Sequence, residues 1–106
     1  MRQLKLSKQP ATSAREAEHS SALLHLRQLA AAQPLGLEPA TEAQLLHWLL
    51  CVAKQYQGRG ATLSELVAAG YSAQVRCLER GVAEKWWTWW VRQEMIRTSQ
   101  NSNAVK

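Results

Sequence analysis

The stretch Thr62–Gly81, "TLSELVAAGYSAQVRCLERG", carries the strongest local signals for the fold of this chain. Thr62 and Glu65 form a capping box, in which the threonine hydroxyl accepts a hydrogen bond from the backbone three residues on and the glutamate reaches back. Gly70 is expected to end the short helix that follows, because glycine readily adopts the left-handed conformation found at helix ends. Ser72 is placed to cap the next helix. The stretch therefore predicts two helices joined by a tight turn.

Two further capping boxes lie upstream, at Ser13–Glu16 and Thr41–Gln44. The first predicts a helix that ends at about Ala32, because Pro34 disfavours helical geometry in the residue before it. The second predicts a helix that closes at the glycines of "QGRG". Its expected apolar stripe consists of Leu46, Leu49, Val52, Ala53 and Tyr56.

Downstream, "EKWWTWWVRQ" (Glu84–Gln93) holds four of the 5 tryptophans. A β-wing would need a turn, but no Gly, Pro, Asn or Asp occurs between Val82 and Arg97. Side chains spaced by three or four residues form a continuous stripe instead: Val75, Leu78, Val82, Trp86, Trp89, Gln93 and Ile96. One long helix over residues 73–97 is predicted, with Trp86 and Trp89 in the core. In that helix Trp87 is the exposed indole and Trp90 lies at the margin.

Length and composition predict a single domain. The chain has 106 residues, is 46% hydrophobic and contains no Phe, and its apolar residues are mostly Leu and Ala, which favour helices. We expect an all-α, compact bundle of about four helices. Its expected parts are a flexible basic N-terminal arm (1–12), a single helical domain (13–98) and a disordered tail (99–106).

The charge is moderately basic, with a net charge of +5 and a pI near 9.7. Residues 1–12 contain Arg2, Lys5 and Lys8 and no acidic residue. Such an arm favours contact with phosphate or with an acidic protein, although a solvated surface explains it equally well.

Residue types needed for catalysis are scarce. The chain contains no Asp, its glycines form no phosphate loop, and the histidines fit no metal-ligand pattern with Cys51 and Cys77. We therefore expect no enzyme activity, no metal site and no cofactor. No apolar run reaches the length of a membrane span or of a signal peptide core, so a cytoplasmic protein with free thiols and no membrane partner is expected.

The predicted pair of helices within Thr62–Gly81 resembles a helix-turn-helix, the unit that places its second helix in the major groove of DNA. The resemblance implies that Val75 and Leu78 hold the second helix on the domain. It implies that these residues contact double-stranded DNA: Ser72, Gln74, Arg76, Cys77, Arg80 and Lys85, with Arg2, Lys5 and Lys8 on phosphates. A structural αα-hairpin without DNA contacts is the alternative.

The leading hypothesis is a small DNA-binding regulatory protein, bacterial or from a mobile element, that uses residues 62–85 in transcription regulation. The alternative is a protein-binding adaptor or inhibitor, such as an accessory protein of a phage or plasmid. It would dock through its Trp-rich C-terminal helix, with Trp87, Trp90 and Val91 at the partner interface or in a homodimer. A third hypothesis is single-stranded nucleic acid stacked on Trp87.

Overall fold

The computed structural model describes the backbone of residues 2–105 and the side chains of residues 16–101. Its elements are α1 (Arg2–Ala32), α2 (Pro39–Gln55), α3 (Leu63–Glu79), a short 3-10 helix η1 (Glu84–Trp86) and α4 (Trp87–Val105). Within the described backbone there is no strand. The predicted all-α bundle of about four helices is confirmed.

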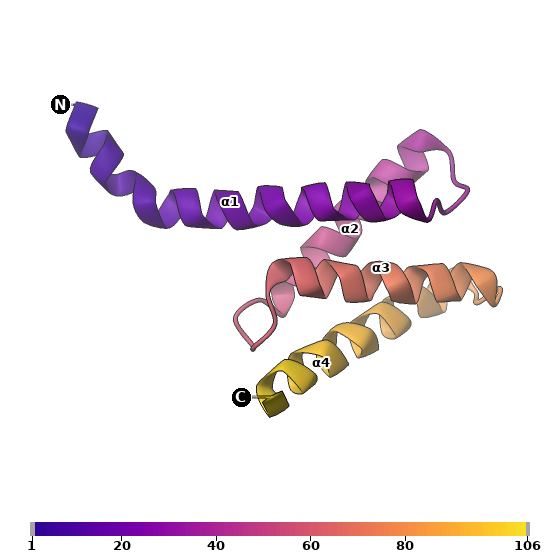
Figure 1. The fold of residues 1–106 in the computed structure, drawn as a ribbon. Helices are drawn as coiled ribbons and strands as arrows, with labels where there is room; N and C mark the ends of the chain where they lie inside the picture. The colour runs from indigo at the N-terminus through magenta and orange to yellow at the C-terminus, as the bar shows by residue number, and fades with distance from the viewer. Residues whose placement is uncertain (1, 106) are drawn as a thin grey trace.

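The central element of the bundle is α3, which packs against each of the other α-helices. In Figure 1, α1 lies along α3, α2 crosses behind them, and α4 runs back beneath α3 in the opposite direction. The core therefore surrounds α3. Its fully buried large apolar side chains are Leu26 of α1, Leu49 of α2, Leu63, Leu66 and Val67 of α3, and Val91 and Met95 of α4.

The cap predicted at Thr62 is confirmed. The Glu65 backbone N–H donates to Thr62 Oγ1 over 3.1 Å, and the Thr62 N–H donates to Glu65 Oε1 over 2.7 Å. The apolar stripe predicted for α2 is also buried along its whole length.

Two predicted helix starts are wrong. α2 begins at Pro39 rather than Thr41, because proline is favoured at the first helical position, where its missing N–H costs no hydrogen bond. α1 spans Arg2–Ala32, so Ser13 does not mark its start.

The turn predicted after Gly70 is absent, because α3 continues without interruption to Glu79. Position 70 requires a residue without a side chain because of helix packing, not because of a turn. A Cβ at this position would lie 2.6 Å from Met95 Cε and 3.3 Å from Leu49 Cδ2, so the glycine allows α2 and α4 to approach α3 closely. Ser72 lies inside α3 and caps no helix. The helix-turn-helix predicted within Thr62–Gly81 is therefore wrong.

The chain turns instead at Gly81, which has a φ of +65°. The Val82 N–H donates to the Cys77 carbonyl over 2.9 Å, and the Gly81 N–H donates to the Leu78 carbonyl over 3.3 Å. These two bonds form a Schellman motif, which ends α3. The single helix predicted over residues 73–97 is wrong, since α3 and α4 are separate helices of a hairpin.

Residues 1–12 and 99–106 are predicted to be flexible, and most of their side chains lie outside the described residues. Their backbone from Arg2 and up to Val105 belongs to α1 and α4. Among the described residues, no helix combines the length and the apolar character that crossing a bilayer requires.

Candidate binding surface

An aromatic and basic surface covers the α3–α4 hairpin. We call it the tryptophan surface; it consists of Arg76, Arg80, Lys85, Trp86, Trp89, Trp90, Gln93, Glu94 and Arg97. All of these residues except Lys85 and Trp86 line one groove between α3 and α4, with a volume of about 480 Å³. Trp86 is 54% exposed and Trp89 is 55% exposed. These are unusually large exposed fractions for indole side chains, which are mostly buried in globular proteins.

The break at Gly81 determines which indoles reach this surface. Because α3 ends there, the apolar stripe of α3 does not continue into α4 with the same phase. The buried stripe of α4 instead follows Val91, Met95 and Ser99, four residues apart. The prediction that Trp86 and Trp89 lie in the core is therefore wrong, and both side chains point outward.

A carboxylate organises the arginines of the groove. Glu94 Oε1 accepts a hydrogen bond from Arg76 Nη2 over 2.9 Å and lies 3.6 Å from Arg97 Nη1. Arg76 also donates from Nη1 to Ser72 Oγ over 3.0 Å. Arg76 is therefore held by two partners within the protein, Glu94 and Ser72. The more exposed Arg97 side chain lies near only one of them, Glu94.

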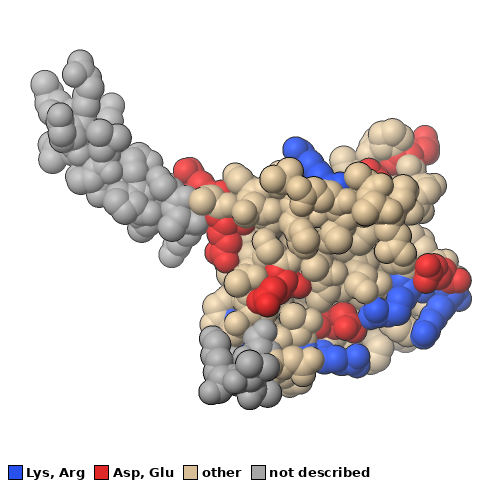
Figure 2. Space-filling model, in the orientation of Figure 1, with Lys and Arg blue, Asp and Glu red and all other residues tan. Residues whose placement is uncertain are grey.

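The other two cations lie against indole rings. The guanidinium carbon of Arg80 is 5.8 Å from the centre of the Trp90 ring, and Lys85 Nζ is 5.7 Å from that of Trp86. The Trp89 and Trp90 rings meet edge to face at 6.1 Å. Figure 2 shows Lys and Arg gathered over the hairpin, with acidic side chains between them.

The residues predicted to contact DNA have mixed outcomes. Arg80 and Lys85 are exposed, Arg76 is partly exposed and Ser72 is exposed on α3. Gln74 and Cys77 are completely buried, so the prediction that they face outward is wrong. Burial raises the pKa of the Cys77 thiol, and the nearby Arg76 guanidinium opposes this shift. The side chains of Arg2, Lys5 and Lys8 lie outside the described residues.

The residues predicted for a partner interface also differ. Val91 is completely buried, so it belongs to the core rather than to an interface. Trp87 is half-buried, so the prediction that it is the exposed indole is wrong. Its Nε1–H donates to the Val82 carbonyl over 2.9 Å, which fixes the turn before α4. Its ring lines a groove with Trp48 of α2. Trp90 remains part of the tryptophan surface.

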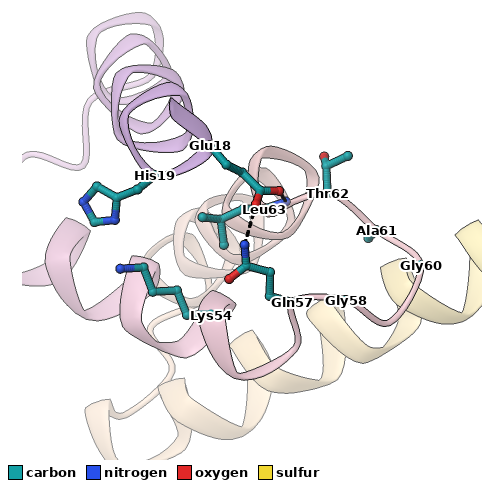
Figure 3. Close-up of a pocket in the computed structure, with 9 residues that line it drawn as sticks. All are labelled: Glu18, His19, Lys54, Gln57, Gly58, Gly60, Ala61, Thr62 and Leu63. Carbon is teal, nitrogen blue, oxygen red and sulfur yellow. Dashed lines mark hydrogen bonds between the residues drawn. The ribbon is translucent and has the colours of Figure 1, made fainter. Parts of the chain in front are cut away.

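A second hollow, the polar cleft, lies where α1 meets the loop between α2 and α3 (Figure 3). Its ionisable side chains are Glu18, His19 and Lys54. Glu18 accepts a hydrogen bond from Gln57 Nε2 over 2.5 Å and one from the Leu63 N–H over 3.4 Å. One oxygen of this carboxylate therefore binds the loop after α2, and the other binds the start of α3. No group of three His, Cys, Asp or Glu side chains that could hold a metal ion occurs among the described residues.

Sequence reasoning missed several surface residues. The sequence prediction places Trp86, Trp89 and Gln93 in the core stripe and gives Arg97 no site, because its single helix over residues 73–97 has the wrong phase. It also missed a pair on α2, where Cys51 Sγ lies 3.5 Å from His47 Nε2. The spacing of four residues was a visible signal for that contact.

Comparison of the chain with family models, curated proteins and solved structures found no significant match.

Proposed function

We propose that this protein binds single-stranded nucleic acid through the tryptophan surface, without catalysis. The observation that carries the proposal is the position of Trp89, which is 55% exposed, in a groove that is also lined by Arg76, Arg80 and Arg97. In η1, which leads into α4, the exposed Trp86 ring has Lys85 beside it. Indole rings stack on bases of any sequence, and cations contact the phosphates between them. The surface combines both kinds of contact on one hairpin.

Charge supports an anionic partner. The groove between α3 and α4 is lined by Arg76, Arg80 and Arg97 against Glu94, which gives these side chains a net charge of 3 − 1 = +2. Arg80 and Lys85 are exposed and are held at indole rings rather than in a salt bridge between described residues. They are therefore placed to contact phosphates, while Trp89 is placed to stack on a base.

The continuity of α3 argues for a single strand rather than a duplex. The duplex hypothesis required an exposed recognition helix that begins at Ser72 and presents Gln74 and Cys77. Both of these side chains are buried. The candidate contacts are instead the exposed indole rings. Such rings can stack on unpaired bases, whose faces are accessible.

The first test is the affinity for a fluorescently labelled single-stranded oligonucleotide, measured by anisotropy across a salt series. Loss of stacking in Trp89→Leu should weaken binding by about 5- to 140-fold, which corresponds to about 1–3 kcal/mol per base. Its salt dependence should stay unchanged, because no phosphate contact is lost. Arg80→Gln/Lys85→Gln should instead reduce the slope of log affinity against log salt by about 1.4, since each phosphate contact contributes about 0.7.

Arg27→Gln is the matched control, because Arg27 is exposed on α1 and lies outside the tryptophan surface. It removes one positive charge from the chain, as each of the two substitutions in the double variant does, and should leave the slope nearly unchanged. Absence of binding at low salt would contradict the proposal. Binding to a duplex as tight as to a single strand would contradict the stacking part of it.

A protein partner is the second candidate function, favoured by Glu94, which lines the groove. A carboxylate there repels phosphate but can pair with basic side chains of a protein, and Trp and Arg are the residues that most often dominate protein interfaces. Capture of partners on the immobilised full chain, with and without nuclease, separates the two functions. A protein retained after nuclease treatment and lost with Trp89→Leu would favour this candidate.

A further inference from the structure

The exposed face of α2 contains a histidine and a cysteine in contact. His47 and Cys51 are one helical turn apart, both are exposed, and His47 Nε2 lies 3.5 Å from Cys51 Sγ. The other cysteine, Cys77, is completely buried and has no part in this pair. The two side chains lie outside both the tryptophan surface and the polar cleft.

We propose that His47 and Cys51 form a bidentate site for a divalent transition metal ion of the zinc class. In tetrahedral zinc sites the Zn–S bond is about 2.3 Å and the Zn–N bond about 2.05 Å. At a tetrahedral angle these bond lengths separate the sulfur and nitrogen atoms by about 3.6 Å. The observed separation of 3.5 Å therefore already matches that of two ligands on one ion.

The helix α2 holds the His47 and Cys51 side chains close together before an ion binds. Residues four apart on an α-helix lie on the same face, so α2 holds the imidazole and the thiol together without any loop having to close. Both side chains are exposed, which leaves an open path for an ion from solvent. Binding should therefore require little change in the protein beyond small side-chain rotations.

The ligand types determine the ion. On binding, Cys51 loses its thiol proton to solvent, and the thiolate and the Nε2 lone pair of His47 each displace one water from the hydrated ion. Thiolate and imidazole select zinc, cobalt, nickel or copper over magnesium and calcium, which prefer oxygen ligands. Since no third His, Cys, Asp or Glu completes a group within the described residues, water takes the remaining positions.

Cobalt(II) tests the site directly, because a cobalt–thiolate bond gives a charge-transfer band in the near ultraviolet. Titration of the reduced full-length chain should produce this band. Cys51→Ser should abolish it. His47→Ala should weaken cobalt binding by more than about tenfold, because even the loss of an outer-shell partner weakens metal sites by about 10- to 100-fold. His25→Ala and Cys77→Ser are the matched controls and should keep the band.

Alkylation provides a second readout that does not depend on cobalt spectroscopy. Zinc ions should slow the modification of Cys51 by iodoacetamide in a mass-spectrometric assay, and a chelator should restore it. The buried Cys77 serves as an internal reference for global unfolding. The proposal is overturned if the charge-transfer band persists in Cys51→Ser, if it is absent at millimolar cobalt, or if zinc protection persists in His47→Ala. If the band is absent, the contact is a thiol–imidazole hydrogen bond without metal affinity; if zinc protection persists in His47→Ala, zinc binds Cys51 without His47.

Discussion

Gln74 lies on the buried face of α3, and its side chain has no exposed surface. Neither its Nε2 nor its Oε1 has a hydrogen-bonding partner among the described residues. Its position follows from helical phase, since it lies four residues after Gly70 and seven after Val67, which are both buried. An amide without partners in the core destabilises the fold, because it loses its bonds to water and gains none in return.

Replacement of this amide should therefore stabilise the protein. Gln74→Met keeps an unbranched side chain of similar length, and we expect the free energy of unfolding to rise by about 1–3 kcal/mol. Urea unfolding of the variant and the parent chain measures this difference. Gln55→Met is the control at an exposed position on α2, where a change within about 0.5 kcal/mol is expected. A loss of stability in Gln74→Met would show that the amide has partners in solution.

At the level of elements, the α3–α4 hairpin contains two glycines with opposite roles. Gly70 keeps helical geometry and makes room for Met95 and Leu49, whereas Gly81 has a positive φ and reverses the chain. A Cβ on Gly81 would meet nothing within 4 Å. Glycine is therefore required at this position only because of its backbone conformation. Gly81 thereby determines the phase of α4 and the exposure of Trp86 and Trp89.

Gly81→Ala should destabilise the hairpin through this conformation. A non-glycine residue in the left-handed region costs about 1–2 kcal/mol, and we expect a loss of that size in urea unfolding. Asparagine tolerates the left-handed region better, so Gly81→Asn should lose clearly less and serves as the matched control. Equal stability of Gly81→Ala and the parent chain would contradict the Schellman end assigned to α3.

At the level of the whole molecule, α1 is joined to α3 near both ends of their contact. Glu18 accepts from the Leu63 N–H at the start of α3. The Tyr71 hydroxyl donates to the Gln33 carbonyl, just after α1, over 2.6 Å. The earlier residue of α1 bonds the earlier residue of α3, and the residue just after α1 bonds the later one. This order supports the parallel packing of α1 on α3 seen in Figure 1.

The Tyr71 bond predicts a dependence of stability on alkaline pH. Burial, and to a smaller extent the Glu42 carboxylate, raises the pKa of the Tyr71 hydroxyl above its ordinary value of 10.0. The contribution of the neutral hydroxyl is therefore fully present below pH 10.0 and is lost as the pH rises towards the folded pKa, because the unfolded chain ionises first. Tyr71→Phe should lose about 1 kcal/mol at neutral pH.

The same variant should show a shallower loss of stability than the parent chain between about pH 9 and pH 11. Urea midpoints across this range measure both slopes. Parallel pH profiles for the two chains would contradict a role for Tyr71 ionisation.

The sequence by itself determined the features that depend on a few neighbouring residues. The hydrogen bonds at Thr62 and Glu65 close within four residues, so the capping box was predicted correctly. The buried stripe of α2 was likewise predictable, since helical periodicity is a local property of the chain. Composition and these patterns together were sufficient for the all-α fold.

Only the tertiary structure decided what each glycine does and which indoles are exposed. Gly70 and Gly81 look alike in the sequence, because a turn and a close helix contact both favour a residue without a side chain. The contact between Gly70 and Met95 joins residues far apart along the chain and has no local signal. Once α3 continued through Gly70 and ended at Gly81, Gln74 became buried and Trp86 and Trp89 became exposed. The tryptophan surface therefore depends on long-range packing rather than on the tryptophan spacing itself.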